Sequence, residues 1–292
     1  MQHPEPRRAA WMRGTAARLL PGARSRARVD VLETEKAALL GERDRLRRRV
    51  EKVEQERTRL RRRARQLELR DDLGYLFVVT YGRSGSTLLQ GILNAIPGYL
   101  IRGENRQMLG LLHEYHRMGT AEKREQRRQQ RKHDLPVGGS TPVRPFYGMD
   151  NFKGQASLKD IRRLALDTIL RPAPDTRVIG FKEIRWDDED VERYVAWLCK
   201  VFPGARFVVN TRDLTSVAQS KWWAEIPDAA EQLAATEARL LALAESLGND
   251  AFHVHYDDYV ADPGTLAPFF DWLGEDFDES RVRGVLEEPH SY

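Results

Sequence analysis

Residues 75–94 constrain the fold more than any other stretch of the chain. A short apolar run from Leu76 to Thr80, rich in β-branched residues, predicts a strand that ends before Gly82. A small, hydroxyl-rich turn follows, and apolar residues then recur at helical spacing as far as Leu93. Strand, turn and helix in this order predict an anion cradle, because glycine lets the backbone come close and free N–H groups at a helix start point at a bound anion. We expect a phosphate or phosphosulfate ligand, with Arg83 adding a positive charge.

The turn lacks the signatures of two common phosphate-binding motifs. A nucleotide-hydrolysing P-loop needs Lys before its Ser or Thr, whereas Gly85 is followed by Ser86. Gly82 and Gly85 are also spaced wrongly for the first glycine pair of the dinucleotide motif. The alternative of an ordinary strand-to-helix turn stays open on these residues alone.

The segment resembles the 5′-phosphosulfate loop of sulfotransferases that use 3′-phosphoadenosine-5′-phosphosulfate (PAPS). The resemblance is greatest to the Arg-Ser-Gly-Thr-Thr form found in tyrosylprotein sulfotransferases and related bacterial enzymes. It implies that the turn holds the 5′-phosphosulfate through five residues: Arg83, Ser84, Gly85, Ser86 and Thr87.

A second segment, residues 205–223, resembles the 3′-phosphate site of the same family. Phe207 to Asn210 predicts a short strand, Arg212 stands at its end, and Asp213 is a plausible N-cap for the helix that follows. Ser220 comes eight residues after Arg212. The resemblance implies that Arg212 and Ser220 hold the 3′-phosphate, and a guanidinium fork suits its paired oxygens. An isolated Arg-Asp pair would instead be a surface ion pair.

Two further segments carry candidate catalytic residues. Gly103 to Arg106 is similar to the Glu-Glu-Thr-Arg stretch of tyrosylprotein sulfotransferases, which implies that Glu104 is the general base that takes the acceptor's proton. The alternative is that Glu104 pairs with Arg102 or Arg106 on the surface. A strand from residue 178 ends in Lys182, and the resemblance implies that this lysine, together with Arg83, stabilises the transferring group. Arg185 is a second candidate for that task.

The C-terminal part gives softer indications. Residues 252–263 are similar to the Tyr-Glu-Asp-Leu…Pro stretch of many sulfotransferases, and the resemblance places Tyr256 near the adenosine. Ser291 is either the first residue of a nucleotide-covering loop or part of a frayed end. Residues 119–157 are polar and then rich in Pro and Gly, which favours a mobile loop over the acceptor site. Trp222 and Trp223 are expected to line that site, or to be buried in the core.

Composition bounds the class of protein. The 41% apolar fraction supports a real core, and the lone cysteine, Cys199, indicates a reducing compartment, for which we expect the cytoplasm. No run approaches the ~18 apolar residues of a membrane span, and no Cys/His cluster has zinc spacing, so we expect no metal. Residues 1–70 hold 21 Lys and Arg against 10 Asp and Glu, and the remainder holds 27 against 34. The donor's phosphates must therefore be held by local cations.

The basic N-terminal part predicts two segments ahead of the catalytic domain at 71–292. Residues 1–28 predict a disordered basic arm, for which we expect weak membrane-surface contact and no specific nucleic acid. Residues 29–70 predict a coiled-coil helix whose heptad d positions are apolar and whose a positions are partly cationic, which favours a marginal homodimer or a helix that depends on a partner. The alternative is a single solvated helix. The d row is Leu32, Leu39, Leu46, Val53, Leu60 and Leu67, and the a row is Val29, Lys36, Arg43, Val50, Arg57 and Ala64.

Short strands at 75–80, 178–182, 206–210 and 252–256 alternate with helical segments, which predicts an α/β fold with a P-loop-like parallel sheet flanked by helices. Ligands in such folds bind beyond the carboxyl ends of the strands. The predicted function is PAPS-dependent sulfuryl transfer to a small-molecule or carbohydrate acceptor, with a carbohydrate or glycolipid hydroxyl preferred. The alternatives are a small-molecule kinase and a nucleotide-binding coiled-coil scaffold without turnover.

Overall fold

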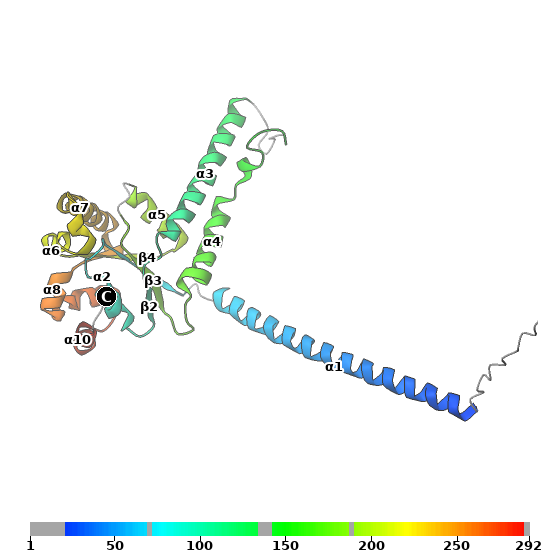
Figure 1. Cartoon of the computed structure of the whole chain (residues 1–292). Coiled ribbons are helices and arrows are strands. Elements are labelled where there is room, and N and C mark those ends of the chain that lie inside the picture. The colour runs from blue at the N-terminus through cyan, green and yellow to red at the C-terminus, as the bar shows by residue number, and fades with distance from the viewer. Residues whose placement is uncertain (1–20, 69–71, 134–141, 187–189, 289–292) are drawn as a thin grey trace, which may run out of the picture. The chain divides into compact units, whose positions relative to one another are not determined.

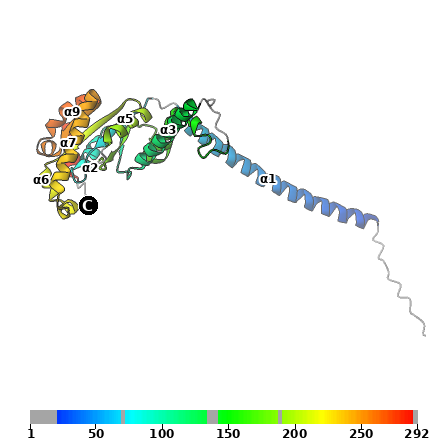
Figure 2. The ribbon, with the colours of Figure 1, turned by 90° about the horizontal axis from the view of Figure 1, so that it is seen from above.

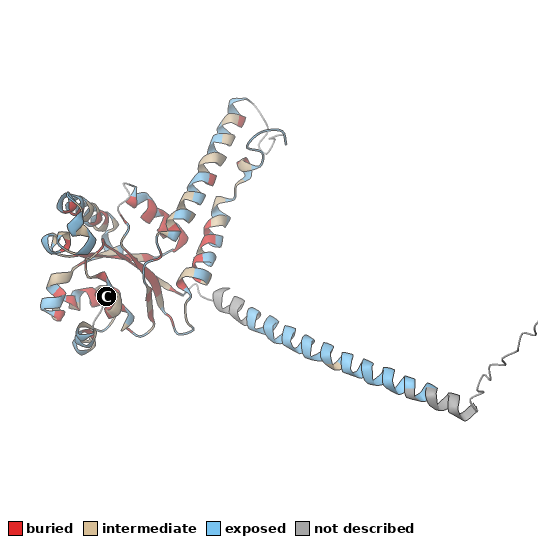
Figure 3. Cartoon of the chain, viewed as in Figure 1, coloured by how far each residue is buried: buried red, intermediate tan, exposed pale blue. Residues whose placement is uncertain are grey.

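The computed structural model describes residues 21–68, 72–133, 142–186 and 190–288. The chain divides into two compact units, residues 1–66 and 67–292, and each is described by itself. The first unit consists, where it is described, of the long helix α1, Pro21–Glu68 (Figure 1). Nearly all of its described side chains, which lie between residues 28 and 60, are exposed (Figure 3). Its first turns occupy residues 21–28, which we expected to be disordered. Pro at a first helical position is well tolerated, and the Ala and Arg residues that follow favour helix. The rest of the expected arm, residues 1–20, lies outside the described residues.

The second unit is built on a five-stranded sheet in the order β2-β3-β1-β4-β5, and every neighbouring pair is parallel. The central strands are apolar and buried on both faces, as parallel strands covered by helices must be. The strands are β1 Gly74–Val79, β2 Tyr99–Arg102, β3 Val178–Glu183, β4 Ala205–Thr211 and β5 Ala251–His255. The predicted parallel sheet is therefore confirmed, and β2 adds a short edge strand.

Two layers of helices cover the sheet (Figure 1). Alternate residues of β1 divide between two cores: Phe77 and Val79 pack toward α4, α5 and α7, while Leu76 and Val78 pack toward α2, α9 and α10. Viewed from above, α3 lies at the opposite end of this unit from α6, α7 and α9 (Figure 2). The helices are α2 Ser86–Asn94, α3 Met108–Lys132, α4 Gly154–Ala165, α5 Val191–Val201, α6 Leu214–Ala218, α7 Ala229–Leu247, α8 Tyr256–Ala261, α9 Ala267–Leu273 and α10 Glu279–Glu287.

The expected loop at 119–157 is largely helical. Helix α3 continues to Lys132, a 3₁₀ turn spans Met149–Asn151, and α4 begins at Gly154. Contacts distant in sequence support this arrangement, because Gln130 donates to the buried Asp150 at 2.9 Å and Lys123 donates to the Phe152 carbonyl oxygen at 2.6 Å. Residues 134–141 lie outside the described part of the chain.

Candidate active site

A cavity of about 490 Å³ opens beyond the carboxyl ends of β1, β3 and β4. Parallel strands present their loops at one edge of the sheet, so segments far apart in sequence meet there. The lining comes from the β1–α2 turn, the ends of β3 and β4, the start of α8 and the C-terminal helix. The lining residues are Gly82, Arg83, Gly85, Ser86, Thr87, Leu88, Glu104, Lys182, Ile184, Arg212, Trp222, Tyr256, Val260, Leu286 and Glu288.

The β1–α2 turn takes a left-handed path into the helix. Arg83 has φ 70° and Gly85 has φ 77°, and the first turn of α2 begins at Ser86. Since the first N–H groups of a helix lack intrahelical partners, this geometry leaves donors available at the cavity. A Cβ on Gly85 would lie 2.0 Å from the Tyr256 ring, so only glycine fits between the turn and α8.

Ser84 is the one predicted member of this turn that does not line the cavity. Its side chain is fully buried, and its hydroxyl lies 2.6 Å from the Thr80 hydroxyl. The Asn210 amide donates to the Ser84 carbonyl oxygen at 2.8 Å, and the Tyr259 hydroxyl donates to the Asn210 side-chain oxygen at 2.9 Å. These buried contacts join the turn to β4 and α8, which fixes the shape of the cradle.

Arg212 reaches the cavity from the end of β4. Its guanidinium donates to the Arg83 carbonyl oxygen at 3.2 Å and lies 4.4 Å from the centre of the Tyr256 ring. Asp257 is 4.0 Å away, and Nε, although buried, has no hydrogen-bond partner among the described residues. A buried cationic donor without a hydrogen-bond partner in a polar cavity fits a phosphate oxygen.

Ser220 lies close to the cavity but outside its lining. Its hydroxyl oxygen accepts from Nε of Arg83 at 3.1 Å, so the serine contacts the cation of the turn directly. The predicted N-cap at Asp213 is confirmed, because its carboxylate accepts from the Ser216 backbone N–H at 2.8 Å, and this bond lowers the pKa of Asp213. The two residues expected at the 3′-phosphate thus flank one short helix, α6.

Glu104 and Lys182 form an ion pair inside the cavity, with Nζ 2.6 Å from Oε1. The lysine side chain is only 6% exposed and the glutamate side chain is 36% exposed. Arg102, one of the partners considered for Glu104, donates instead to the carbonyl oxygens of Leu170 and Arg171. Glu104 therefore faces the cavity with a buried cation beside it.

The segment that carries Glu104 is held by Glu183, the last residue of β3. This fully buried carboxylate accepts from the backbone N–H groups of Asn105 and Gln107, both at 3.2 Å, and from that of Ile184 at 2.9 Å. Arg185, the second candidate for stabilising charge, is exposed and does not line the cavity. Glu183 and Asn210 were not predicted, although each follows apolar strand residues at the carboxyl end of the sheet.

The two tryptophans divide between the expected roles. Trp222 lines the cavity and is partly exposed, whereas Trp223 packs against the core and donates to the Gly82 carbonyl oxygen at 3.1 Å. Tyr81, just before the turn, is buried, which raises its pKa, and its hydroxyl accepts from the Arg212 backbone N–H at 2.9 Å. Ser291 lies outside the described residues.

The described residues contain neither a candidate metal site nor a candidate membrane-spanning helix. No group of three or more His, Cys, Asp or Glu residues there has an arrangement suited to a metal ion. No helix in the same ranges is both long and apolar enough to cross a membrane.

Comparison with known proteins identifies the class that this fold and cavity define. The profile of the sulfotransferase family matches residues 76–279, more than half of the chain, and the chain belongs to that family. A search of curated proteins gave no match.

Solved sulfotransferase structures are also similar to the chain. The sulfotransferase domain of the Synechococcus PCC 7002 olefin synthase is 20% identical, with 74% of this chain and 78% of that chain covered and a TM-score of 0.43. The sulfotransferase domain from the curacin biosynthetic pathway is 17% identical, with 74% and 79% covered and a TM-score of 0.45. A sulfotransferase from Mycobacterium avium is 16% identical, with 79% and 71% covered and a TM-score of 0.41.

Proposed function

We propose that this chain transfers the sulfuryl group of PAPS to an acceptor hydroxyl in the cavity at the carboxyl ends of β1, β3 and β4. The observation that carries the proposal is that the ion pair of the buried Lys182 and the more exposed Glu104 shares one cavity with the β1–α2 turn and Arg212. A base beside a buried cation suits transfer to a hydroxyl, and the turn and Arg212 suit the phosphates of the donor.

Both the 5′-phosphosulfate and the 3′-phosphate of PAPS have candidate binding groups in the cavity. The turn of Arg83, Gly85, Ser86 and Thr87, with the N–H groups at the start of α2, would hold the 5′-phosphosulfate. Ser84 would contribute through its backbone, since its side chain is buried away from the cavity. Arg212, whose Nε has no hydrogen-bond partner among the described residues and a carboxylate only at 4.0 Å, would hold the 3′-phosphate.

Ser220 and Tyr256 complete this donor site. The Ser220 hydroxyl, which is 3.1 Å from Arg83 Nε, would add a hydroxyl donor for the 3′-phosphate. The Tyr256 ring lies under the Arg212 guanidinium and offers a flat surface for the adenine. Removal of either side chain should weaken donor binding.

The chemistry of the chain follows from Glu104 and its neighbours. The donor supplies a sulfuryl group whose bond to the 5′-phosphate oxygen breaks as the acceptor oxygen attacks sulfur. Glu104 accepts the acceptor's proton at a carboxylate oxygen. Lys182 and Arg83 stabilise the negative charge that develops at the transferring and leaving oxygens. Most of the rate gain would come from positioning and charge stabilisation, as in phosphoryl transfer.

The acceptor that we propose is a carbohydrate hydroxyl, preferably that of a glycolipid. Four residues after Glu104, α3 begins an exposed apolar stripe at helical spacing: Met108, Leu111, Tyr115 and Met118. Such a stripe on the helix that follows Glu104 can cover the lipid part of an amphiphilic acceptor. With Cys199 as the single cysteine, we also propose a cytoplasmic location.

The first experiment is calorimetric titration with adenosine 3′,5′-bisphosphate, 5′-AMP and ATP. Selective binding of the bisphosphate, weakened at least tenfold in Arg212→Ala, supports the proposal, because a charge-assisted hydrogen bond contributes ~1.5–3 kcal/mol. Arg193→Ala, an exposed arginine on α5, is the matched control and should bind normally. Equal affinity of the wild-type protein for 5′-AMP and the bisphosphate would contradict the proposed function.

Turnover separates the enzyme from its alternatives. Transfer of labelled sulfate from PAPS to an acceptor supports the proposal, whereas Mg²⁺-dependent phosphate transfer from ATP would favour a small-molecule kinase. Bisphosphate binding without transfer to any acceptor would favour a scaffold. For the acceptor class, Leu111→Asp should raise KM for a glycolipid and leave KM for its water-soluble sugar headgroup unchanged.

A further inference from the structure

We propose that α1 pairs with α1 of a second copy as a parallel, in-register two-stranded coiled coil, in which glutamates of one helix neutralise the cations in the seam of the other. The inference concerns the first unit alone and does not depend on the proposed chemistry. The partner is a second copy of this chain, because the charge pattern of α1 is complementary to itself.

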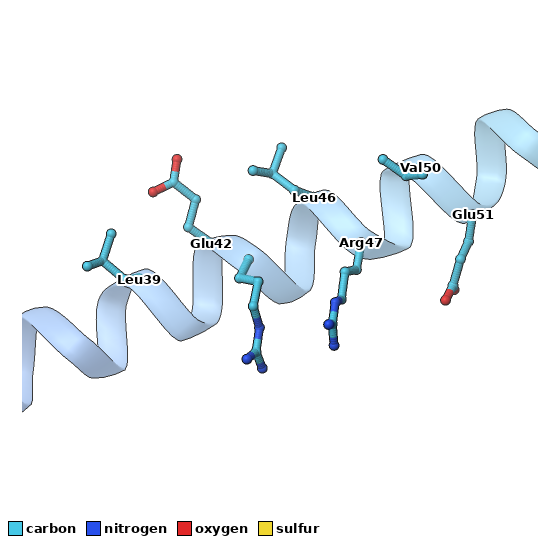
Figure 4. Close-up of a pocket in the computed structure, with 7 residues that line it drawn as sticks. Leu39, Glu42, Leu46, Arg47, Val50 and Glu51 are labelled. Atoms are coloured by element: carbon cyan, nitrogen blue, oxygen red, sulfur yellow. The ribbon is translucent and has the colours of Figure 1, made fainter.

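The apolar d row of α1 is exposed wherever its side chains are described. The d-row residues Leu32, Leu39, Leu46, Val53 and Leu60 are all more than half exposed, with Leu46 at 55% (Figure 3). Leu39, Leu46 and Val50 lie along one side of the helix (Figure 4). A helix that leaves such a row in water is far from its most stable state, since each buried leucine adds about 1.5–3 kcal/mol.

A groove on this side has the composition of two adjoining coiled-coil holes. In a parallel pair, an a-position side chain enters a hole formed by d, g, a and d residues, and a d-position side chain enters a hole formed by a, d, e and a residues. Leu39, Glu42, Arg43 and Leu46 make the first set, and Arg43, Leu46, Arg47 and Val50 make the second. The groove is lined by Leu39, Glu42, Arg43, Leu46, Arg47, Val50 and Glu51.

Cations at a positions would by themselves destabilise a coiled coil. In the parallel pair, each of them has an acidic neighbour. Position g immediately precedes position a, and the g residue of the partner borders the a-position hole. Every charged a residue among the described side chains follows a glutamate, whereas Val29 and Val50 follow an arginine. The three Glu–cation steps are Glu35–Lys36, Glu42–Arg43 and Glu56–Arg57. Each cation in the seam therefore meets a glutamate of the other helix.

The flanking positions agree with the same register. In a parallel pair, each g residue faces the e residue five positions later on the other helix. The pairs with two charged members among the described side chains are all of opposite sign: Arg28 with Glu33, Glu42 with Arg47, and Arg49 with Glu54. The remaining pair, Glu35 with Leu40, has one charge.

A shifted register loses this complementarity. A slip of one heptad places Glu42 opposite Glu54 along one side of the pair. The same slip places Arg49 opposite Arg47 along the other side. Like charges at these positions are unfavourable, so the charges select the in-register pair over its neighbour.

The test is sedimentation equilibrium of the full chain over a wide concentration range, combined with a charge exchange. The expected mass is twice the 33.7 kDa of one chain. Arg49→Glu or Glu54→Arg alone creates two like-charge pairs per dimer and should raise the dimer dissociation constant roughly fivefold, and the double variant should restore it. Residues 49 and 54 do not share a face within one helix, so restoration reports on a contact between helices.

The control variant is Arg48→Glu, which makes the same charge change as Arg49→Glu at an f position outside the groove. It should leave the dissociation constant unchanged. A monomer at all concentrations, a trimer, or a dimer that the double variant fails to restore would overturn the proposal. An antiparallel dimer, in which residue 49 does not face residue 54, would appear as failure of the double variant.

Discussion

At the scale of single residues, Gly85 shows how one position can be fixed by two independent constraints. Its φ of 77° disfavours any side chain, and a Cβ there would also collide with the Tyr256 ring at 2.0 Å. Gly274 has almost the same φ, 78°, but a Cβ would meet nothing within 4 Å. We therefore expect Gly274→Ala to lower the free energy of unfolding by about 1 kcal/mol. Gly85→Ala should cost more and should also abolish bisphosphate binding.

Urea denaturation and calorimetry on these two variants separate backbone strain from the shape of the cradle. If Gly85→Ala costs no more than Gly274→Ala and still binds the bisphosphate, the turn is not the donor's cradle.

Glu104 is the residue whose role is most open to a direct kinetic test. Glu104→Gln keeps the size of the side chain and removes its basicity, so turnover should fall by about 10²–10⁴. Bisphosphate affinity should change little, since Arg212 and the β1–α2 turn remain. Glu245→Gln, an exposed position on α7, serves as the control for the same chemical change. Retained turnover in Glu104→Gln would show that another group takes the proton.

At the scale of elements, the segment between β2 and α3 is held by a strand that is distant in sequence. Glu183→Ala leaves the backbone N–H groups of Asn105 and Gln107 without their acceptor and should cost ~1–3 kcal/mol of folding free energy. Glu183→Gln keeps one acceptor oxygen and should cost less. Both should lower kcat more than they weaken bisphosphate binding, because Glu104 moves while the donor site does not.

Thermal denaturation and single-turnover kinetics on the two Glu183 variants check this expectation. A loss of stability with unchanged turnover would mean that the position of Glu104 does not depend on Glu183.

The elements that could be predicted from the sequence are those whose own residues form a clear hydrophobic pattern. β1, β3 and β4 carry apolar runs, and β5 alternates apolar residues with histidines. The cations Arg83, Lys182 and Arg212 come at or after strand ends, where a parallel sheet gathers its ligands. The second half of α3 has no apolar stripe, and it depends on contacts such as Gln130 with Asp150, which no local pattern reveals. The burial of Ser84 and the roles of Asn210 and Glu183 likewise arise only when strands distant in sequence meet.

At the scale of the whole molecule, the positive and negative charge of the chain are separated along the sequence. Residues 71–292 hold 34 Asp and Glu against 27 Lys and Arg, so an anionic donor approaches a part of the chain with net negative charge. Binding must then come from a few placed cations and not from an overall attractive field. We expect calorimetry to show that bisphosphate affinity falls only modestly with ionic strength, because the Arg212 side chain is only 27% exposed and such charges are screened less than fully exposed ones.

The same arrangement predicts how a donor analogue stabilises the catalytic unit. The cavity is lined from β3, β4, α8 and the β1–α2 turn, so one ligand joins segments that unfolding would separate. Adenosine 3′,5′-bisphosphate at a hundred times its Kd should add ~2.7 kcal/mol to the free energy of unfolding. The corresponding rise in Tm is about 5–10 °C, which near-UV circular dichroism of the tryptophans can follow. At the same concentration 5′-AMP should give a smaller rise, because it lacks the phosphate that Arg212 would hold. Equal rises with the two nucleotides would mean that Arg212 contributes nothing to recognition of the 3′-phosphate.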